Sequence, residues 1–138
     1  MFNYRMCILS VAATLLFSAP ISNAADLDKQ LVGEWQGQRD AESKCSFLAW
    51  KLNRSADGKF EITFYSNPNK TEEAGREHGI WWVNSKEYFT QTEGVPTPDG
   101  YSYSFINQDT VRYAVLTRDP SADCKDDYEF TDHRVVGK

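Results

Sequence analysis

The residues of this 138-residue chain that could do chemistry are few, and their spacing fits no common catalytic motif. The two histidines are His78 and His133, and His133 follows Asp132, a carboxylate that could orient its ring. This pair lacks a nucleophile, because no serine lies in the Gly-X-Ser-X-Gly context of a nucleophile elbow. The sequence therefore predicts a protein that is not an enzyme, with no catalytic residue, metal or cofactor, and with His133 on the surface.

The acidic residues raise a second chemistry, the binding of calcium. Five of them fall in one short stretch, namely Asp119, Asp123, Asp126, Asp127 and Glu129. The stretch lacks the ordered Asp-X-Asp-X-Asp-Gly spacing of an EF-hand loop, so we interpret it as a solvated loop. The net charge of −5 also argues against nucleic acid and anionic membranes as partners, since both favour a basic surface.

Residues 1–24 have the composition of an export signal. Arg5 gives a positive start, residues 7–17 form an apolar run, and Ser22 and Ala24 supply the small residues that cleavage requires. The apolar run is too short to span a bilayer, which needs about 20 residues. We therefore expect a signal peptide, one mature domain over residues 25–138, and a periplasmic or secreted location without membrane insertion after cleavage.

The mature domain keeps two cysteines, Cys45 and Cys124. In an exported protein such a pair most simply forms one disulfide. Closing a loop of this length removes unfolded-chain entropy worth about 4–4.5 kcal/mol in the chain-entropy model. A metal site at these cysteines would need His78 and His133 as its further ligands, so we predict the disulfide.

From Gly33 onward the apolar residues repeat with a period of two, and turn residues fall at intervals suited to hairpins. Asp57-Gly58, for example, tolerates the positive φ of a tight hairpin. A helical turn over 26–30 precedes the strands. The pattern predicts eight strands over residues 33–39, 45–54, 59–66, 76–83, 86–91, 101–106, 110–118 and 128–136.

Consecutive strands with short connections pair with their neighbours, which gives an up-and-down antiparallel sheet. Eight such strands close into a barrel, and closure removes the exposed edges of an open sheet. A sandwich of two sheets is the alternative that the same alternation allows. We predict the all-β, eight-stranded barrel, whose interior is either filled by side chains or holds one small ligand.

Gly33-Glu34-Trp35, at the start of the first strand, resembles the Gly-X-Trp signature of the lipocalin or calycin superfamily. In that superfamily an arginine late in the final strand packs across the tryptophan and closes the barrel. The resemblance implies that Gly33, Trp35 and Arg134 form this closure here. The chain is shorter than typical lipocalins and shows no C-terminal helix, so it is more similar to small bacterial periplasmic lipocalin-like barrels, which include metalloprotease inhibitors.

The resemblance implies a binding protein, and the aromatic residues on the strands offer two places for binding. Inward-facing aromatic side chains either fill the barrel or line a cup for a small apolar or aromatic ligand. For the cup, the predicted ligand-binding residues are Trp50, Trp82, Tyr88 and Tyr103. For the filled barrel, the loops 67–75 and 93–99 would instead block a target enzyme. Some barrels of the superfamily hold haem through a late histidine, but His133 has the opposite strand parity to Arg134, which argues against haem.

Overall fold

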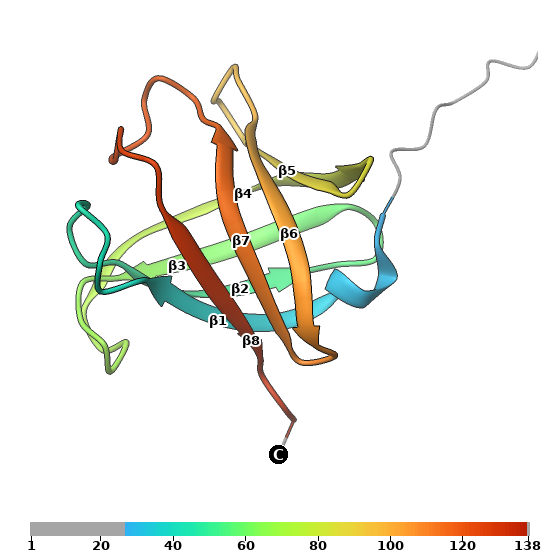
Figure 1. Cartoon of the computed structure of the whole chain (residues 1–138), viewed down its shortest axis with the longest axis horizontal. Helices are drawn as coiled ribbons and strands as arrows, with labels where there is room; N and C mark the ends of the chain where they lie inside the picture. The colour runs from blue at the N-terminus through green and yellow to red at the C-terminus, as the bar shows by residue number, and fades with distance from the viewer. Residues whose placement is uncertain (1–26, 138) are drawn as a thin grey trace, which may run out of the picture.

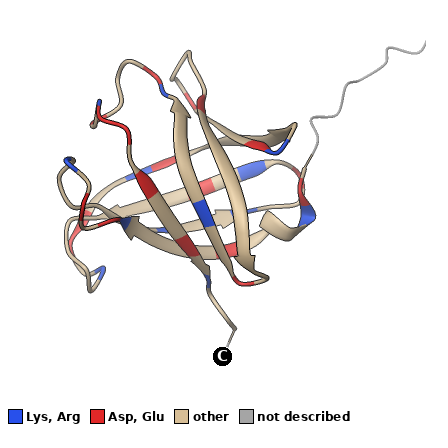
Figure 2. Ribbon diagram, viewed as in Figure 1, with Lys and Arg blue, Asp and Glu red and all other residues tan. Residues whose placement is uncertain are grey.

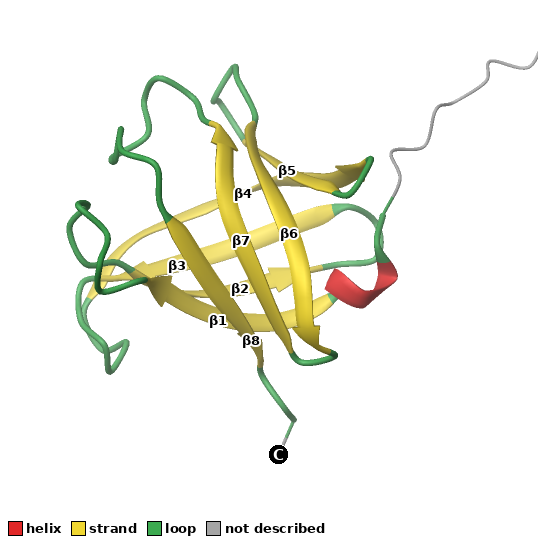
Figure 3. Cartoon of the chain, in the orientation of Figure 1, coloured by secondary structure: helices red, strands yellow, loops and turns green. Residues whose placement is uncertain are grey.

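The computed structural model describes residues 27–137, which form one closed antiparallel barrel (Figure 1, Figure 3). A short 3-10 helix precedes eight strands: η1 (Lys29–Leu31), β1 (Gly33–Arg39), β2 (Ala49–Arg54), β3 (Lys59–Tyr65), β4 (Glu73–Asn84), β5 (Glu87–Thr92), β6 (Asp99–Asn107), β7 (Thr110–Thr117) and β8 (Glu129–Arg134). Each strand pairs with the next along the chain, and β8 pairs with β1. This confirms the predicted barrel over the sandwich. The predicted signal peptide lies outside the described residues.

The register between strands decides which side chains face the interior. Trp35 on β1 lies opposite Leu52 on β2 and opposite Arg134 on β8, so these three side chains share the inner face. Alternate residues then continue that face along each strand. The buried core formed in this way contains Trp35, Trp50, Leu52, Phe60, Trp81, Tyr88, Val111, Tyr113 and Phe130, and Leu31 of η1 completes it.

One end of the barrel is closed by Trp35, whose side chain is fully buried. Its Nε1 donates a hydrogen bond to the carbonyl oxygen of Leu31 (2.9 Å), so η1 lies across this end. The guanidinium of Arg134 lies 4.2 Å from the Trp35 ring centroid. It also donates to the carbonyl oxygens of Val32 (3.0 Å) and Gln30 (2.7 Å). The last strand thereby holds the N-terminal segment over the tryptophan.

Gly33 has two reasons to be a glycine at this closed end. Its φ is +122°, in a region that side chains with a Cβ rarely adopt. A Cβ at this position would also lie 3.1 Å from Nη1 of Arg134. The glycine therefore permits both the backbone conformation and the approach of the arginine to Trp35.

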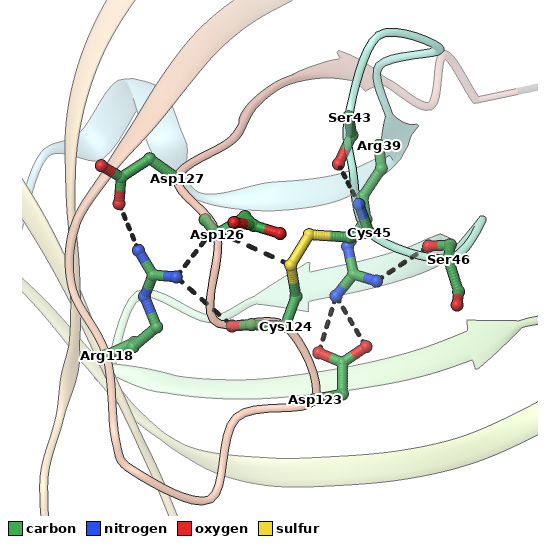
Figure 4. Close-up of a disulfide and its surroundings, with 9 residues drawn as sticks. All are labelled: Arg39, Ser43, Cys45, Ser46, Arg118, Asp123, Cys124, Asp126 and Asp127. Carbon is green, nitrogen blue, oxygen red and sulfur yellow. Dashed lines mark hydrogen bonds and ion pairs between the residues drawn. A yellow bond between two sulfur atoms is a disulfide. The ribbon is translucent and has the colours of Figure 1, made fainter.

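The opposite end is open and carries the four longer connections, residues 40–48, 66–72, 93–98 and 118–128 (Figure 1). The predicted disulfide between Cys45 and Cys124 is confirmed and joins the first of these connections to the last, with Cα atoms 5.6 Å apart (Figure 4). Acidic and basic residues both occur in the open-end connections (Figure 2). The two loops considered for enzyme binding, 67–75 and 93–99, overlap two of these connections and so lie on the same rim.

Two strand boundaries differ from the sequence-based expectation by three residues or more, and the others agree within two. β4 begins at Glu73 rather than at residue 76, because its polar first residues continue the ladder with β3 across a register shift after Phe64. β2 begins at Ala49 rather than at Cys45, because the disulfide draws the preceding residues into the rim. No helix among residues 27–137 has the length and apolar character needed to cross a membrane.

Candidate functional site

A cavity of about 470 Å³ occupies the open half of the barrel, and we call it the cup. Strands β2 and β3 form its apolar wall, because their inward residues are almost all large and apolar. This wall consists of Trp50, Leu52, Phe60, Ile62 and Phe64, together with Leu48 from the connection before β2. The interior is therefore divided: the half around Trp35 is packed, and the half below the open end is hollow.

The wall formed by β4, β5 and β6 is polar, with Glu77, Thr90, Thr92, Asp99 and Tyr101 lining it. Thr92 Oγ1 donates a hydrogen bond to the carboxylate of Glu77 (3.1 Å). Burial raises the pKa of Glu77, and the negative charge of Asp99 raises it further. Burial likewise raises the pKa of Asp99. This side of the mouth therefore disfavours additional negative charge.

The floor of the cup is an ion pair in the centre of the barrel. Arg54 on β2 is 1% exposed and Asp132 on β8 is 0% exposed, with Nη2 and Oδ2 3.2 Å apart. Arg54 also donates from Nε to the hydroxyl of Tyr88 and from Nη2 to the hydroxyl of Tyr113, both at 3.0 Å. Asp132 Oδ1 accepts from Trp50 Nε1 (2.8 Å). Both carboxylate oxygens act as acceptors, as in an ionised carboxylate.

Burial and the contacts within the pair shift the pKa values of Asp132 and Arg54 in opposite directions. Burial raises the pKa of Asp132, while Arg54 and the hydrogen bond from Trp50 oppose that rise. Burial also disfavours the charge of Arg54, but its contacts with Tyr113, Tyr88 and Asp132 raise its pKa above the ordinary value. Removing one partner of such a pair costs about 3–5 kcal/mol, since it leaves a buried charge uncompensated. The Arg54–Asp132 pair is therefore expected to stay in place as the polar floor of the cup.

Gly37 on β1 leaves the space that this floor needs. A Cβ at Gly37 would overlap Oδ1 of Asp132 and would lie 2.8 Å from Nε1 of Trp50. These are the two atoms of the hydrogen bond that orients the carboxylate. The opening stretch of the barrel thus contains one glycine for the closed end and a second for the floor of the cup.

A second charge-paired arginine, Arg39, lies at the mouth end of β1 and is 4% exposed. Its Nη2 donates to both carboxylate oxygens of Asp123 (2.6 and 2.8 Å), and its Nη1 donates to the carbonyl oxygen of Ser46 (2.9 Å). Its guanidinium lies 5.0 Å from the ring centroid of Tyr128. Ser46 and Asp123 belong to the two connections that the disulfide joins, so the ion pair and the disulfide hold the same part of the rim (Figure 4).

The structure separates the four predicted ligand-binding residues. Trp50 and Tyr88 line the cup. Tyr103 faces the closed half of the barrel instead, where its hydroxyl donates a hydrogen bond to the carboxylate of Asp28 (2.8 Å). Only two of the four therefore lie where a ligand in the cup would touch them, and Tyr103 holds the segment that precedes η1.

Trp82 lies on the outer face of the barrel, which corrects its assignment to the interior. It stacks on Phe89 of β5, with ring centroids 5.5 Å apart. The inward tryptophan of β4 is its neighbour Trp81, which is 1% exposed and belongs to the core. Two adjacent tryptophans suit a strand in either orientation, and a shift of one residue exchanges the faces of the whole strand.

Sequence reasoning missed the polar floor, although a signal for it was present. Arg54 shares its period-two face with Trp50 and Leu52, so it had to point into an otherwise apolar interior. A charged side chain is rarely buried unless it is paired. Asp132 has the same strand parity as the inward Arg134 and is the partner that this rule requires.

The remaining chemically active side chains lie on the surface or in ion pairs, except Asp119 of the acidic stretch, which is 5% exposed and accepts hydrogen bonds from Thr97 and Ser121. His133 is exposed on the outer face of β8, and His78 pairs with Glu93 at the surface. In the acidic stretch, Asp127 pairs with Arg118. Within residues 27–137, no group of three or more His, Cys, Asp or Glu side chains is arranged to hold a metal ion.

The fold and the site define a class of protein: a closed antiparallel barrel with an open cup that has an apolar wall and an arginine–aspartate floor. Comparison with known proteins adds no family to this description, since neither a scan against protein-family models nor a search of curated proteins found a match. The argument for function therefore rests on the cup and its rim.

Proposed function

We propose that this protein is an exported, lipocalin-like binding protein that takes a small apolar or aromatic molecule into the cup. The observation that carries the proposal is the cavity of about 470 Å³, a volume typical of small-molecule sites. Trp50 and Phe60 supply large apolar surfaces in its wall. The barrel is closed and tied by a disulfide at the rim, so little ordering is needed when a ligand enters.

Two further features support the class and the location. The arrangement of Gly33, Trp35 and Arg134 resembles the closure of lipocalin barrels, and it leaves the other end free for a ligand. The disulfide between Cys45 and Cys124 favours an oxidising compartment, in agreement with the signal-like residues 1–24.

The proposal is tested by filling the cup. The neutral fluorophore N-phenyl-1-naphthylamine should bind saturably to the protein, with a fluorescence increase. Thr90 lines the cup, and Thr90→Trp should weaken this binding at least about tenfold by occupying the cavity. Ser104 is exposed on the outer face of β6, so Ser104→Trp is the matched control and should bind as the wild type does. Equal binding by both variants, or no saturable binding, would contradict the proposal.

A second candidate is an inhibitor that blocks an enzyme through the rim. In the connection between β3 and β4, Asn67 Oδ1 accepts hydrogen bonds from the backbone N–H groups of Thr71 and Glu72, both at 3.0 Å, so this exposed loop has a set shape. The double variant Asn69→Ser, Lys70→Gly alters its tip, and the φ of +54° at residue 70 suits glycine. An inhibitor should lose its effect on exported hydrolases in this variant while dye binding persists. If the wild type inhibits none of them, this candidate fails.

A further inference from the structure

We propose that the ligand of the cup is electrically neutral and presents a hydrogen-bond acceptor, such as a carbonyl group, on its apolar or aromatic body. This inference rests on the proposed binding function and narrows the class of ligand. It is carried by Arg39 and Arg54, the two buried arginines that line the cup.

Each of these arginines keeps one buried N–H group without an acceptor. Among residues 27–137, the buried side-chain polar atoms that lack a hydrogen-bond partner are Nε of Arg39 and Nη1 of Arg54. Buried donors are nearly always paired in folded proteins, because an unpaired donor keeps its full desolvation cost. Both arginines belong to the lining of one cavity, and their unpaired N–H groups are covered. An acceptor brought into the cup would pair with them once the guanidinium groups shift toward it.

The charge of each arginine is already compensated, so the missing partner is an acceptor and not an anion. Arg39 pairs with Asp123 at 2.6 Å, and Arg54 pairs with Asp132 at 3.2 Å. A carboxylate placed against Arg54 would leave two negative charges around one guanidinium that is only 1% exposed. Uncompensated buried charge is strongly unfavourable. A carbonyl oxygen accepts the same hydrogen bond without adding charge.

The acidic residues at the mouth disfavour anionic ligands, and the arginine donors disfavour cationic ones. Glu77 and Asp99 line the entrance. Burial and then the charge of Asp99 raise the pKa of Glu77, and burial and then the charge of Asp119 raise the pKa of Asp99, so an entering anion adds to an existing repulsion. An ammonium group has donors and no acceptor, so it cannot satisfy an arginine N–H. A neutral molecule with an acceptor meets both conditions.

The experiment compares three naphthalenes of similar size on the intact protein. They are 2-acetylnaphthalene, which has a neutral acceptor, 2-naphthoate, which is anionic, and 2-isopropylnaphthalene, which has no acceptor. By equilibrium dialysis at pH 7.5, 2-acetylnaphthalene should bind about tenfold tighter than each of the others, the ratio expected for a hydrogen bond from a charged donor. Equal binding of the ketone and the hydrocarbon, or tighter binding of 2-naphthoate, would overturn this inference and leave the binding function standing. If no probe binds, both fail.

Paired substitutions assign the preference to the arginines without leaving a buried charge. Arg54→Met with Asp132→Asn removes both members of the floor pair, and it should abolish the preference for the ketone while 2-isopropylnaphthalene still binds. At the rim, Arg39→Met with Asp123→Asn is the milder pair, because Asp123 is 64% exposed. Near-ultraviolet circular dichroism confirms folding of each variant. If both variants fold and keep the tenfold preference for the ketone, the assignment of this preference to the arginines is contradicted. If either variant is unfolded, the wild-type probe series decides the ligand class.

Discussion

Replacing Asp132 with asparagine tests the buried floor most directly. Asparagine has nearly the same size, but it carries an oxygen and an NH2 group in place of two equivalent acceptors. In the wild type, one carboxylate oxygen accepts from Trp50 Nε1 and the other from Arg54 Nη2. In Asp132→Asn, the new NH2 group must face one of these donors. The variant also removes the negative charge beside an arginine that is 1% exposed.

Breaking a buried pair from one side costs about 3–5 kcal/mol, and the surviving oxygen keeps one of the hydrogen bonds, so we expect a loss of about 3 kcal/mol. In a domain of this size that corresponds to a fall in Tm of roughly 12 °C. The assay is urea unfolding followed by tryptophan fluorescence, with the disulfide intact and the m-value unchanged.

The control is Asp127→Asn, because Asp127 also pairs with an arginine, Arg118, but is 90% exposed. An exposed ion pair contributes about 0–1 kcal/mol, so this variant should be nearly neutral. The double variant Arg54→Met, Asp132→Asn should lose less stability than Asp132→Asn alone, since no buried charge remains. A loss below about 1 kcal/mol for Asp132→Asn, or a loss equal to that of the control, would refute the buried pair.

Four further changes test other parts of the barrel. Trp35→Ala should cost about 3–5 kcal/mol in urea unfolding, because the side chain is fully buried, and a loss below about 1 kcal/mol would contradict its role at the closed end. Gly37→Ala should cost about 1–3 kcal/mol by the same assay, because the added methyl group overlaps the floor carboxylate, and a neutral effect would mean that the floor can shift. Cys45→Ser with Cys124→Ser should lose up to about 4.5 kcal/mol, because the bridge spans 79 residues, and calorimetry with and without reductant measures this loss. Folding raises the pKa of Glu77, so wild-type stability falls as pH rises through that raised value, and Glu77→Gln avoids this fall. The variant should therefore be the more stable protein at pH 7, and its advantage should vanish below the ordinary carboxyl pKa, as unfolding at several pH values will show.

The barrel could be predicted from the sequence because its signals are local and repeated. Period-two runs separated by turn residues specify strands one at a time, and short connections leave few ways to pair them. The approach of Arg134 to Trp35 was expected from the resemblance of Gly33-Glu34-Trp35 to the lipocalin signature, and the pairing of β1 with β8 brings the two residues together. The disulfide followed from a cysteine pair in a chain with an export-like leader.

The details of the site were harder to predict because they depend on the register between strands, which the pattern within one strand does not specify. Whether Trp81 or Trp82 faces inward is decided by pairing with β3 and β5, and both residues suit a strand equally well. The pairing of Arg54 with Asp132 spans 78 residues, and β2 and β8 are neighbours of β1 on its two sides. Local patterns can show that Arg54 faces inward, but only the closed barrel brings its partner within reach.

The contacts around the rim also indicate how the proposed ligand would enter the cup. Three of the four open-end connections are tied together. The disulfide joins 40–48 to 118–128. Asp119 links 118–128 to 93–98 by accepting a hydrogen bond from the backbone N–H of Thr97 (3.2 Å), and its own backbone N–H donates to Asp99 at the start of β6 (2.8 Å). In the fourth connection, residues 66–72, the side-chain hydrogen bonds found within the described part of the chain stay inside the loop. Displacing this loop therefore breaks no side-chain hydrogen bond to another connection among the described residues, and the loop follows β3, which forms part of the apolar wall. We expect a ligand to enter over this side and to meet the apolar wall before its acceptor reaches the arginines.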